Sequence, residues 1–428
     1  MVKLEELVSL AKRRGFIWPS SEIYGGLSGV WDYGPMGIQL KRNIQALWWR
    51  MFVEDREDMF GVDAGIMMSQ RVWEASGHVS GFSDPLVECE KCHKRFRADH
   101  IKGEVCPDCD GKLSESREFN MMFETHIGAS RDTASTVYLR PETAQGMFVN
   151  FKNLMDSMHP KLPFGMGQIG KAFRNEINAR DFIFRVREFE QMEIEYFTRE
   201  EEWEEHFGKW RNLMHEWMKL IGLPAEHIHE LEVEGDDLAH YSKRTIDFEF
   251  DFPFGREELY GLAYRTDFDL KAHMESSGVD LRYFDDQKNE RFLPHVIEPT
   301  FGLERTVLAV LAASYTTDEM GEGRVFLKLP KRIAPVAVAV FPLVRNKPEI
   351  TEKALAVYQG VKRDFPTAAW DDSGNIGKRY RRQDEIGTPY CVTIDHQTLE
   401  DDTVTLRDRD TGKQERIGVG ELLSKLSD

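Results

Sequence analysis

Residues 164–197 constrain the fold of this chain most, because polar and apolar residues alternate along two runs in this segment. Successive side chains of a strand point to opposite faces of a sheet. In the second run Met192, Ile194 and Tyr196 therefore share an apolar face. The other face is expected to carry Gln168, Gly170, Ala172, Arg174 and Glu176 from the first run and Phe189, Gln191, Glu193 and Glu195 from the second. The pattern predicts an antiparallel hairpin with one polar face, which the two small residues leave open.

The connection between the two runs, residues 177–184, is longer than the roughly two to five residues usual in a hairpin. It carries Arg180, Phe182 and Phe184. Long connections of this kind are usually functional or disordered. An ordinary hairpin with a solvated charged face would show the same periodicity, so the pattern alone leaves both interpretations open.

The residue types favour a functional hairpin. Phe173-Arg174-Asn175-Glu176 and Arg185-Val186-Arg187-Glu188-Phe189 resemble motif 2 of the class II aminoacyl-tRNA synthetases, in the form found in the glycyl-tRNA synthetases. The resemblance covers almost the whole chain. Its further segments are residues 97–100, 119–125, 140–146, 258–261, 265–270 and 298–305, of which the last resembles motif 3.

The resemblance implies a multidomain protein of α+β and α/β type. Residues 1–330 would form the antiparallel-sheet catalytic domain of a class II synthetase, with a zinc-binding insertion at 86–115, and residues 331–428 an anticodon-binding domain. The C-terminal pattern agrees, because apolar strand-like runs at 336–341, 390–394 and 403–406 alternate with a predicted helix at 349–365. Residues 374–382 form a basic stretch in this region, although a solvated helix start would look the same.

Composition indicates a globular chain. Its 428 residues, 41% apolar, are enough for two or three domains. No apolar run approaches the length of a membrane span and the N-terminus lacks a signal-peptide pattern, so we expect a cytoplasmic protein with no membrane partner. The net charge of −18 arises in residues 1–330. It argues against a nonspecific DNA coat but allows a nucleic-acid partner at a local basic patch.

Residues 35–53 are predicted to form a helix with an apolar stripe of Leu40, Ile44, Leu47 and Met51, followed by a strand at 62–68. This order resembles motif 1, which implies a homodimer, although Gln70 stands where the family usually has proline. After the hairpin, Thr198 and Glu201 have the spacing of a capping box. The helix that follows has an aromatic-rich stripe, which we assign to the core: Trp203, Phe207, Trp210, Met214, Trp217 and Ile221.

Four cysteines have the spacing of a zinc ribbon: Cys89-x2-Cys92 and Cys106-x2-Cys109, with thirteen residues between the pairs. Two disulfides or a redox pair are the alternatives. Disulfides are rare in a reducing cytosol, and a redox pair would be expected in a thioredoxin-like sequence setting. Four thiolates leave no open coordination position, so a zinc ion here would be structural. The fifth cysteine, Cys391, is expected in the core.

The motif residues suit ATP chemistry. A guanidinium on a rigid strand can hold phosphate oxygens as charge builds in the transition state, so Arg174 and, from motif 3, Arg305 are the predicted catalytic residues. The resemblance places adenine on Phe189, with Glu176 accepting from its amino group, and Glu258 would bind Mg²⁺. The full predicted ATP site is Arg174, Asn175, Glu176, Phe184, Arg185, Arg187, Glu188, Phe189, Glu258, Leu259, Gly302 and Arg305.

Glu142, Glu193 and Glu298 match family positions that line the amino-acid pocket. Three acids in a small pocket repel one another unless a cation joins them, and the ammonium of glycine would be that cation. Alternatively these acids pair with Arg185, Arg187 or Arg265 and only hold the sheet together. The full predicted glycine site is Arg97, Glu142, Phe189, Gln191, Glu193, Glu298, Thr300 and Gly302, with Thr300 where the family usually has serine.

These observations predict a glycine–tRNA ligase. Glycine and ATP would form glycyl-adenylate and pyrophosphate, and the glycyl group would pass to tRNA(Gly) with release of AMP. Another synthetase of the same subclass is a weaker alternative, because residues 140–146 and 265–270 favour glycine. A noncatalytic descendant that only binds nucleic acid, such as a DNA-polymerase accessory subunit, should have lost Arg174 and Arg305. Both are present.

Overall fold

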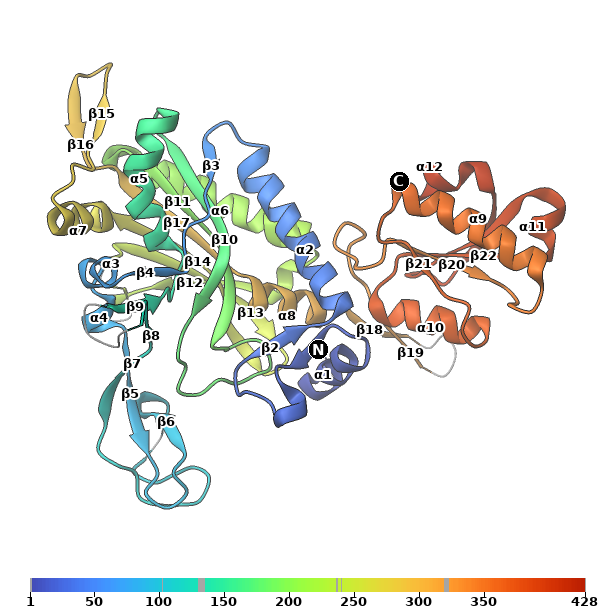
Figure 1. Cartoon of the computed structure of the whole chain (residues 1–428), viewed down its shortest axis with the longest axis horizontal. Helices are drawn as coiled ribbons and strands as arrows, with labels where there is room; N and C mark the ends of the chain where they lie inside the picture. Colours follow the sequence, from blue (N-terminus) through green and yellow to red (C-terminus); the bar gives the residue numbers. More distant parts are fainter. Residues whose placement is uncertain are drawn as a thin grey trace.

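In the computed structural model, residues 2–101, 103–129, 135–235, 238–239, 241–318 and 323–427 are described. A seven-stranded sheet dominates the larger part of the molecule, and a five-stranded sheet forms the smaller C-terminal part (Figure 1). Across the described part of the chain no helix is long and apolar enough to cross a membrane.

The large sheet has the strand order β12-β13-β14-β17-β11-β10-β3. Neighbouring strands in it are antiparallel, except that β10 and β3 are parallel. Its strands are β3 (Met59–Gly61), β10 (Phe164–Phe173), β11 (Glu188–Thr198), β12 (Ile228–Val233), β13 (Arg244–Phe252), β14 (Gly255–Thr266) and β17 (His295–Gly302). One face packs on α2 (Pro35–Trp49), α6 (Trp203–Leu220) and α8 (Leu303–Ser314) in the main hydrophobic core. The other face is apolar under α5 (Ala144–Met158) and α7 (Phe268–Ser277) and polar elsewhere.

Strands β10 and β11 form the predicted hairpin, with Gln168 opposite Glu193 and Ala172 opposite Phe189. The apolar face of β11 is buried in the core as expected. Gly170, however, does not leave the polar face of the hairpin open to a ligand. A Cβ on Gly170 would lie 2.2 Å from Nη2 of the buried Arg140, whose guanidinium donates to the carbonyls of Lys171 and Ala64. The glycine therefore admits a protein arginine rather than a ligand.

Two local predictions are wrong. Residues 62–66 are not a strand: short strands lie on either side, β3 and β4 (Met67–Ser69). Asp63 and Gly65 are poor strand formers, and Arg140 binds the carbonyl of Ala64. Thr198 does not cap a helix, because it is the buried last residue of β11, and a 3-10 turn (Glu200–Glu202) precedes α6.

The aromatic stripe of α6 is buried as predicted. In α2 the fully buried residues are Leu40, Ile44 and Trp48, and Phe52 follows in a π-helical turn (Arg50–Glu54). Leu47 and Met51 only flank this core. The buried face of this helix is therefore rotated from the predicted apolar stripe toward Trp48 and Phe52. Both rings pack against Phe301 of β17.

The cysteine-containing segment projects from the large domain (Figure 1). It is built on a three-stranded sheet of β5 (Ser83–Glu88), β6 (Arg95–Arg97) and β7 (Arg117–Asn120). The remaining elements of the larger part are α1 (Leu4–Arg13), β1 (Ile17–Pro19), β2 (Trp31–Tyr33), α3 (Gln70–Ala75), α4 (His78–Gly81), β8 (Phe123–His126), β9 (Thr136–Leu139), β15 (Tyr283–Asp285), β16 (Glu290–Phe292), β18 (Tyr315–Asp318) and β19 (Arg324–Leu327).

The C-terminal sheet has the order β21-β20-β22-β23-β24 and its own hydrophobic core. Its elements are β20 (Val338–Pro342), α9 (Pro348–Asp364), β21 (Ala369–Trp370), α10 (Ile376–Ile386), β22 (Tyr390–Ile394), α11 (His396–Asp401), β23 (Thr403–Asp408), β24 (Gln414–Gly418) and α12 (Leu422–Ser427). The expected mixed α/β pattern is present, and Cys391 is buried. Within the basic stretch Arg379 is also buried and donates to three backbone carbonyls, so this stretch is not simply a solvated helix start.

Candidate active site

A pocket opens on the polar face of the large sheet, where β11, β14 and β17 meet the loop after β10 and the first turn of α8. Its lining is Arg174, Glu176, Phe184, Arg185, Val186, Phe189, Gln191, Glu258, Leu259, Tyr260, Thr300, Gly302, Glu304 and Arg305. The hairpin, residues 258–261 and the motif 3 segment thus converge at one place. Most residues of the predicted ATP site line this pocket.

Arg174 follows directly on β10. Its Nε donates to the carbonyl of Pro141 at 3.0 Å, and its guanidinium carbon lies 5.3 Å from the ring centroid of Phe189. Phe189 faces Ala172 across the hairpin, so the ring has a small neighbour on the opposite strand. Among the described residues, the guanidinium of Arg174 is hydrogen-bonded through Nε alone. Its two terminal nitrogens are therefore available to a ligand.

Arg305 lies in the first turn of α8. Its Nη1 donates to the backbone carbonyl of Glu258 at 2.8 Å and to the Glu258 carboxylate at 2.9 Å. The charge of Arg305 lowers the pKa of Glu258, so this carboxylate is ionised at neutral pH. The Glu258 side chain is 48% exposed, and an ion pair so open to water can exchange its partner for another cation.

The long loop of the hairpin folds back onto the pocket. Phe184 packs against Phe252 and Phe254, and Arg305 lies over its ring at 4.4 Å. The turn requires positive φ at Asp181 and Phe182. The loop is therefore an ordered wall of the pocket.

Behind the pocket lies a cluster of buried acids. Glu193 accepts hydrogen bonds from Thr143, from Thr300 at 3.0 Å and from Gln191 at 3.2 Å. Glu298 accepts from Arg265 at 2.9 Å. Gln191 and Thr300 also line the pocket, so they connect it directly to the acids. The structure therefore brings the predicted glycine-binding acids next to the predicted ATP site.

The acids of this cluster differ in charge. Burial opposes ionisation of Glu142, but His78, with Nε2 at 3.3 Å, and Arg265 lower its pKa well below the usual range. Burial and then the charge of Glu142 raise the pKa of Glu193. Burial also raises the pKa of Glu298 to about 8, because it outweighs the opposing effect of Arg265. At neutral pH the cluster thus carries less negative charge than its composition suggests.

Several predicted residues do not line the pocket. Arg97 forms ion pairs with Asp84 at 3.0 Å and with Asp99 at 2.7 Å. Arg187 donates to the carbonyls of Ser28 and Glu176, Glu188 pairs with Lys171, and the backbone of Asn175 donates to Met121. These contacts support the loop and the base of the inserted segment rather than forming the pocket wall.

The alternative in which the acids only hold the sheet together applies to one of them. Glu298 pairs with Arg265, which also binds Asp269 through two nitrogens. Arg187 instead donates to backbone carbonyls, and Arg185 lies 3.9 Å from Glu176. Glu193 has only neutral donors among the described residues.

Sequence analysis named Arg265 only as one possible partner of the acids, and it missed three other residues that hold this cluster in place: His78, Thr143 and Asp269. All three lie in stretches that resemble the family, but only the fold shows which groups they contact. Val186, Tyr260 and Glu304 line the pocket and were also missed. Tyr260 and Glu304 lie in segments that resemble the family, so strand and helix periodicity could have indicated them.

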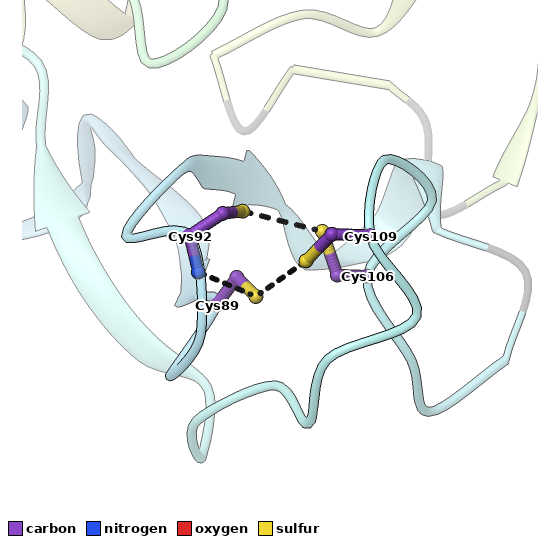
Figure 2. A group of neighbouring side chains, drawn as sticks. All are labelled: Cys89, Cys92, Cys106 and Cys109. Atoms are coloured by element: carbon purple, nitrogen blue, oxygen red, sulfur yellow. Dashed lines mark hydrogen bonds between the residues drawn. The ribbon is translucent and has the colours of Figure 1, made fainter.

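The four cysteines meet at the tip of the projecting segment (Figure 2). All four are free thiols, and their sulfurs lie within 4.8 Å of one another. Cys89 Sγ is 3.5 Å from Cys109 Sγ, and Cys92 Sγ is 3.7 Å from Cys106 Sγ. Disulfide sulfurs would lie about 2.05 Å apart, whereas four sulfurs each about 2.3 Å from a zinc ion lie roughly 3.8 Å apart. The donor set fits a tetrahedral zinc site.

Comparison with known proteins gives a consistent match. Residues 123–314 match the tRNA synthetase class II core domain (G, H, P, S and T), and residues 337–428 match the anticodon binding domain. The chain is similar to the glycine–tRNA ligase of Caldanaerobacter subterraneus subsp. tengcongensis, with 46% identity over 98% of this chain and 97% of the relative. It is 47% identical to those of Treponema denticola, over 99% and 96% of the two chains, and Streptomyces coelicolor, over 98% and 97%.

Proposed function

Because this chain belongs to the glycine–tRNA ligase family, we propose that it joins glycine to tRNA(Gly) at the pocket between Arg174 and Arg305. A glycine carboxylate oxygen attacks the α-phosphorus of ATP, and the bond to pyrophosphate breaks. A hydroxyl of the terminal tRNA ribose then attacks the glycyl carbonyl, and AMP leaves. One observation carries the proposal: Arg174 and Arg305 line the same pocket. The wall of that pocket includes Gln191 and Thr300, which both donate hydrogen bonds to the buried Glu193.

Arg174 is proposed to bind the α-phosphate. Negative charge increases on the phosphate oxygens as the fifth bond to phosphorus forms, and a guanidinium held in place stabilises that charge without reorganising. The hydrogen bond from its Nε to Pro141 fixes the side chain. No general base is needed, because the attacking carboxylate is already ionised and the reaction depends on positioning and charge.

Arg305 and Glu258 are proposed to act on the pyrophosphate side. Glu258 is ionised and half exposed, as a magnesium ligand beside a triphosphate requires. Bound Mg²⁺ would neutralise charge on the departing phosphates. Phe189 offers its ring to adenine, and the Glu176 carboxylate offers an acceptor to the adenine amino group.

Glycine is proposed to place its ammonium among Glu142, Glu193 and Glu298. Glycine has no side chain to bind, so the enzyme must select it by ammonium recognition and by excluding larger residues. Thr300 donates to Glu193 and carries a methyl group at the pocket wall. That methyl group is expected to narrow the space beside the α-carbon and so to disfavour alanine.

The remaining parts of the proposal concern the other domains and partners. We assign residues 1–330 to catalysis, 331–428 to the anticodon and 86–115 to a structural zinc ion held by Cys89, Cys92, Cys106 and Cys109. With four protein ligands the zinc would stabilise the insertion without taking part in the reaction. A homodimer is proposed from the resemblance to motif 1.

Charging of tRNA tests the function directly. Purified protein incubated with ATP, Mg²⁺, labelled glycine and a tRNA(Gly) transcript should yield labelled tRNA, with one AMP and one pyrophosphate released per glycyl group. A tRNA for another amino acid serves as the control. Activation of glycine without transfer to either tRNA would contradict the second step of the proposal.

A further inference from the structure

Glu195 is a buried carboxyl group that the proposed reaction does not use. It lies on β11, on the same face as Glu193 and two residues further along. Its side chain is 0% exposed, and neither carboxyl oxygen has a hydrogen-bond partner among the described residues. Buried polar groups are nearly always hydrogen-bonded, so this orphaned pair of oxygens needs an explanation.

The neighbours of Glu195 are mainly acids. One carboxyl oxygen from each of Glu193, Glu195 and Glu298 lies within 4.8 Å of the other two. The register between β11 and β17, with Glu193 opposite Thr300 and Tyr196 opposite Ile297, places Glu195 opposite Glu298. Asp269 and Glu142 are also ionisable groups of this cluster. The basic groups around the cluster have other partners: Arg265 is bound to Asp269 and Glu298, the His78 ring lies against Glu142, and Arg140 donates to backbone carbonyls. Ionised Glu195 would be a buried charge without a donor of its own.

Hydrogen bonds within the cluster decide where a proton on Glu195 can go. Both oxygens of Glu193 already accept from Thr143, Thr300 or Gln191. Glu298 accepts from Arg265 at Oε2 only, as far as the described residues show. Its Oε1 is therefore the available acceptor, and a protonated Glu195 supplies the missing donor.

We propose that Glu195 is a positioning residue that remains protonated and donates its O–H to Glu298, so that Glu298 can receive the ammonium group of the amino-acid substrate as a carboxylate. This inference rests on the proposed function, because it assigns the ammonium group to this cluster. A protonated Glu195 is neutral, so its side chain can be buried without a cationic partner. In agreement, burial and the charge of Glu298 raise the pKa of Glu195 well above the usual range. Glu298 exchanges its own proton for the ammonium, whereas Glu195 keeps its proton throughout.

Two substitutions distinguish the effect of the proposed Glu195 hydrogen bond from the effects of the charge and the volume of the Glu195 side chain. Glu195→Gln keeps a neutral donor of the same size, whereas Glu195→Met keeps the length and removes the donor. We expect Glu195→Met to raise KM for glycine about tenfold or more, since it removes a hydrogen bond to a charged group. Glu195→Gln should restore KM to within about threefold of the parent value, and KM for ATP should stay near the parent value in both variants.

Either of two results would overturn the proposal. Equal damage from Gln and Met would mean that Glu195 acts as a carboxylate or that a bound cation replaces its proton. No effect of Met would mean that Glu195 only fills space.

Infrared difference spectroscopy tests the proton without any substrate. The difference between the spectrum of the parent protein and that of Glu195→Gln should show the C=O stretch of a protonated carboxylic acid at neutral pH. Carboxylate bands in its place would overturn the proposal even if Glu195→Met failed to fold. Because this readout needs no turnover, it also separates failure of this inference from failure of the proposed function, which would appear as absence of glycine-dependent activity in the parent protein.

Discussion

Single residues in the acid cluster differ mainly in whether they hold a proton. Glu142 is stabilised as a carboxylate by His78 and Arg265, whereas burial raises the pKa of Glu193 and Glu298. At neutral pH Glu298 therefore holds a proton in place of a bound cation. Binding of the proposed substrate should exchange this proton for the ammonium group.

The pKa of about 8 at Glu298 predicts a pH-dependent affinity for glycine. This value lies above the ordinary carboxyl value of about 4.3, so the free protein holds a proton on Glu298 below about pH 8. The ammonium prefers the carboxylate and must displace that proton. KM for glycine should fall as the pH rises toward about 8 and should then level off, with KM for ATP as the internal control. A flat glycine profile would contradict this assignment.

Glu193→Gln distinguishes a binding acid from one that only supports the sheet. The substitution keeps the size and removes the charge that the ammonium requires. We expect KM for glycine to rise by a factor of about ten to a hundred, as for loss of a hydrogen bond to a charged group, with KM for ATP nearly unchanged. Equal loss of affinity for both substrates would support the alternative in which Glu193 only holds the strands together.

Arg174→Ala should slow amino-acid activation by a factor of about a hundred, or on the order of 3 kcal/mol, because the contact is strongest in the transition state. The measurement is the rate of glycine-dependent pyrophosphate exchange, with thermal unfolding as the check on folding. Arg282→Ala is a matched control, since Arg282 is an exposed arginine that pairs with Asp280. Exchange at the parent rate in Arg174→Ala would show that Arg174 is not the phosphate ligand.

Elements with strong local patterns could be predicted from the sequence, and those decided by tertiary contacts could not. The hairpin and the buried stripe of α6 follow from periodicities of two and 3.6 residues. The strand expected at 62–66 is absent because Arg140, which is distant in sequence, binds the carbonyl of Ala64. The role of Gly170 depends on the same arginine. The acids could be proposed from the resemblance, with Arg265 as one of three possible arginine partners. The choice of Arg265 among the three, and the contact of His78 with Glu142, came from the fold.

The cysteine-containing element should depend on zinc while the ATP pocket does not. Elemental analysis is expected to give one zinc ion per chain. Chelation should increase hydrogen exchange in residues 88–113, because a zinc ion bound by the four thiolates would hold the two cysteine-bearing loops together. KM for ATP should change little. A metal-free protein with two disulfides would contradict the zinc assignment.

On the scale of the whole molecule, helix α10, which carries most of the basic stretch, also contacts the larger part of the chain. Glu385 of α10 pairs with Arg13 and Arg14 at the end of α1, and Asp384 pairs with Arg324 and Arg407. Asp384 and Glu385 are buried in these contacts. The C-terminal part is therefore joined to the larger part of the chain through the same helix that carries its basic residues.

ATP–pyrophosphate exchange with each amino acid in turn is the most direct test of the central claim, that this pocket activates glycine. The acid cluster, the wall residue Thr300 and the two arginines predict rapid exchange with glycine. They predict exchange with alanine that is slower by a factor of about ten or more, because one methyl group is worth about 1–3 kcal/mol in a fitted pocket. Exchange with another amino acid at a rate equal to or above that with glycine would contradict the account.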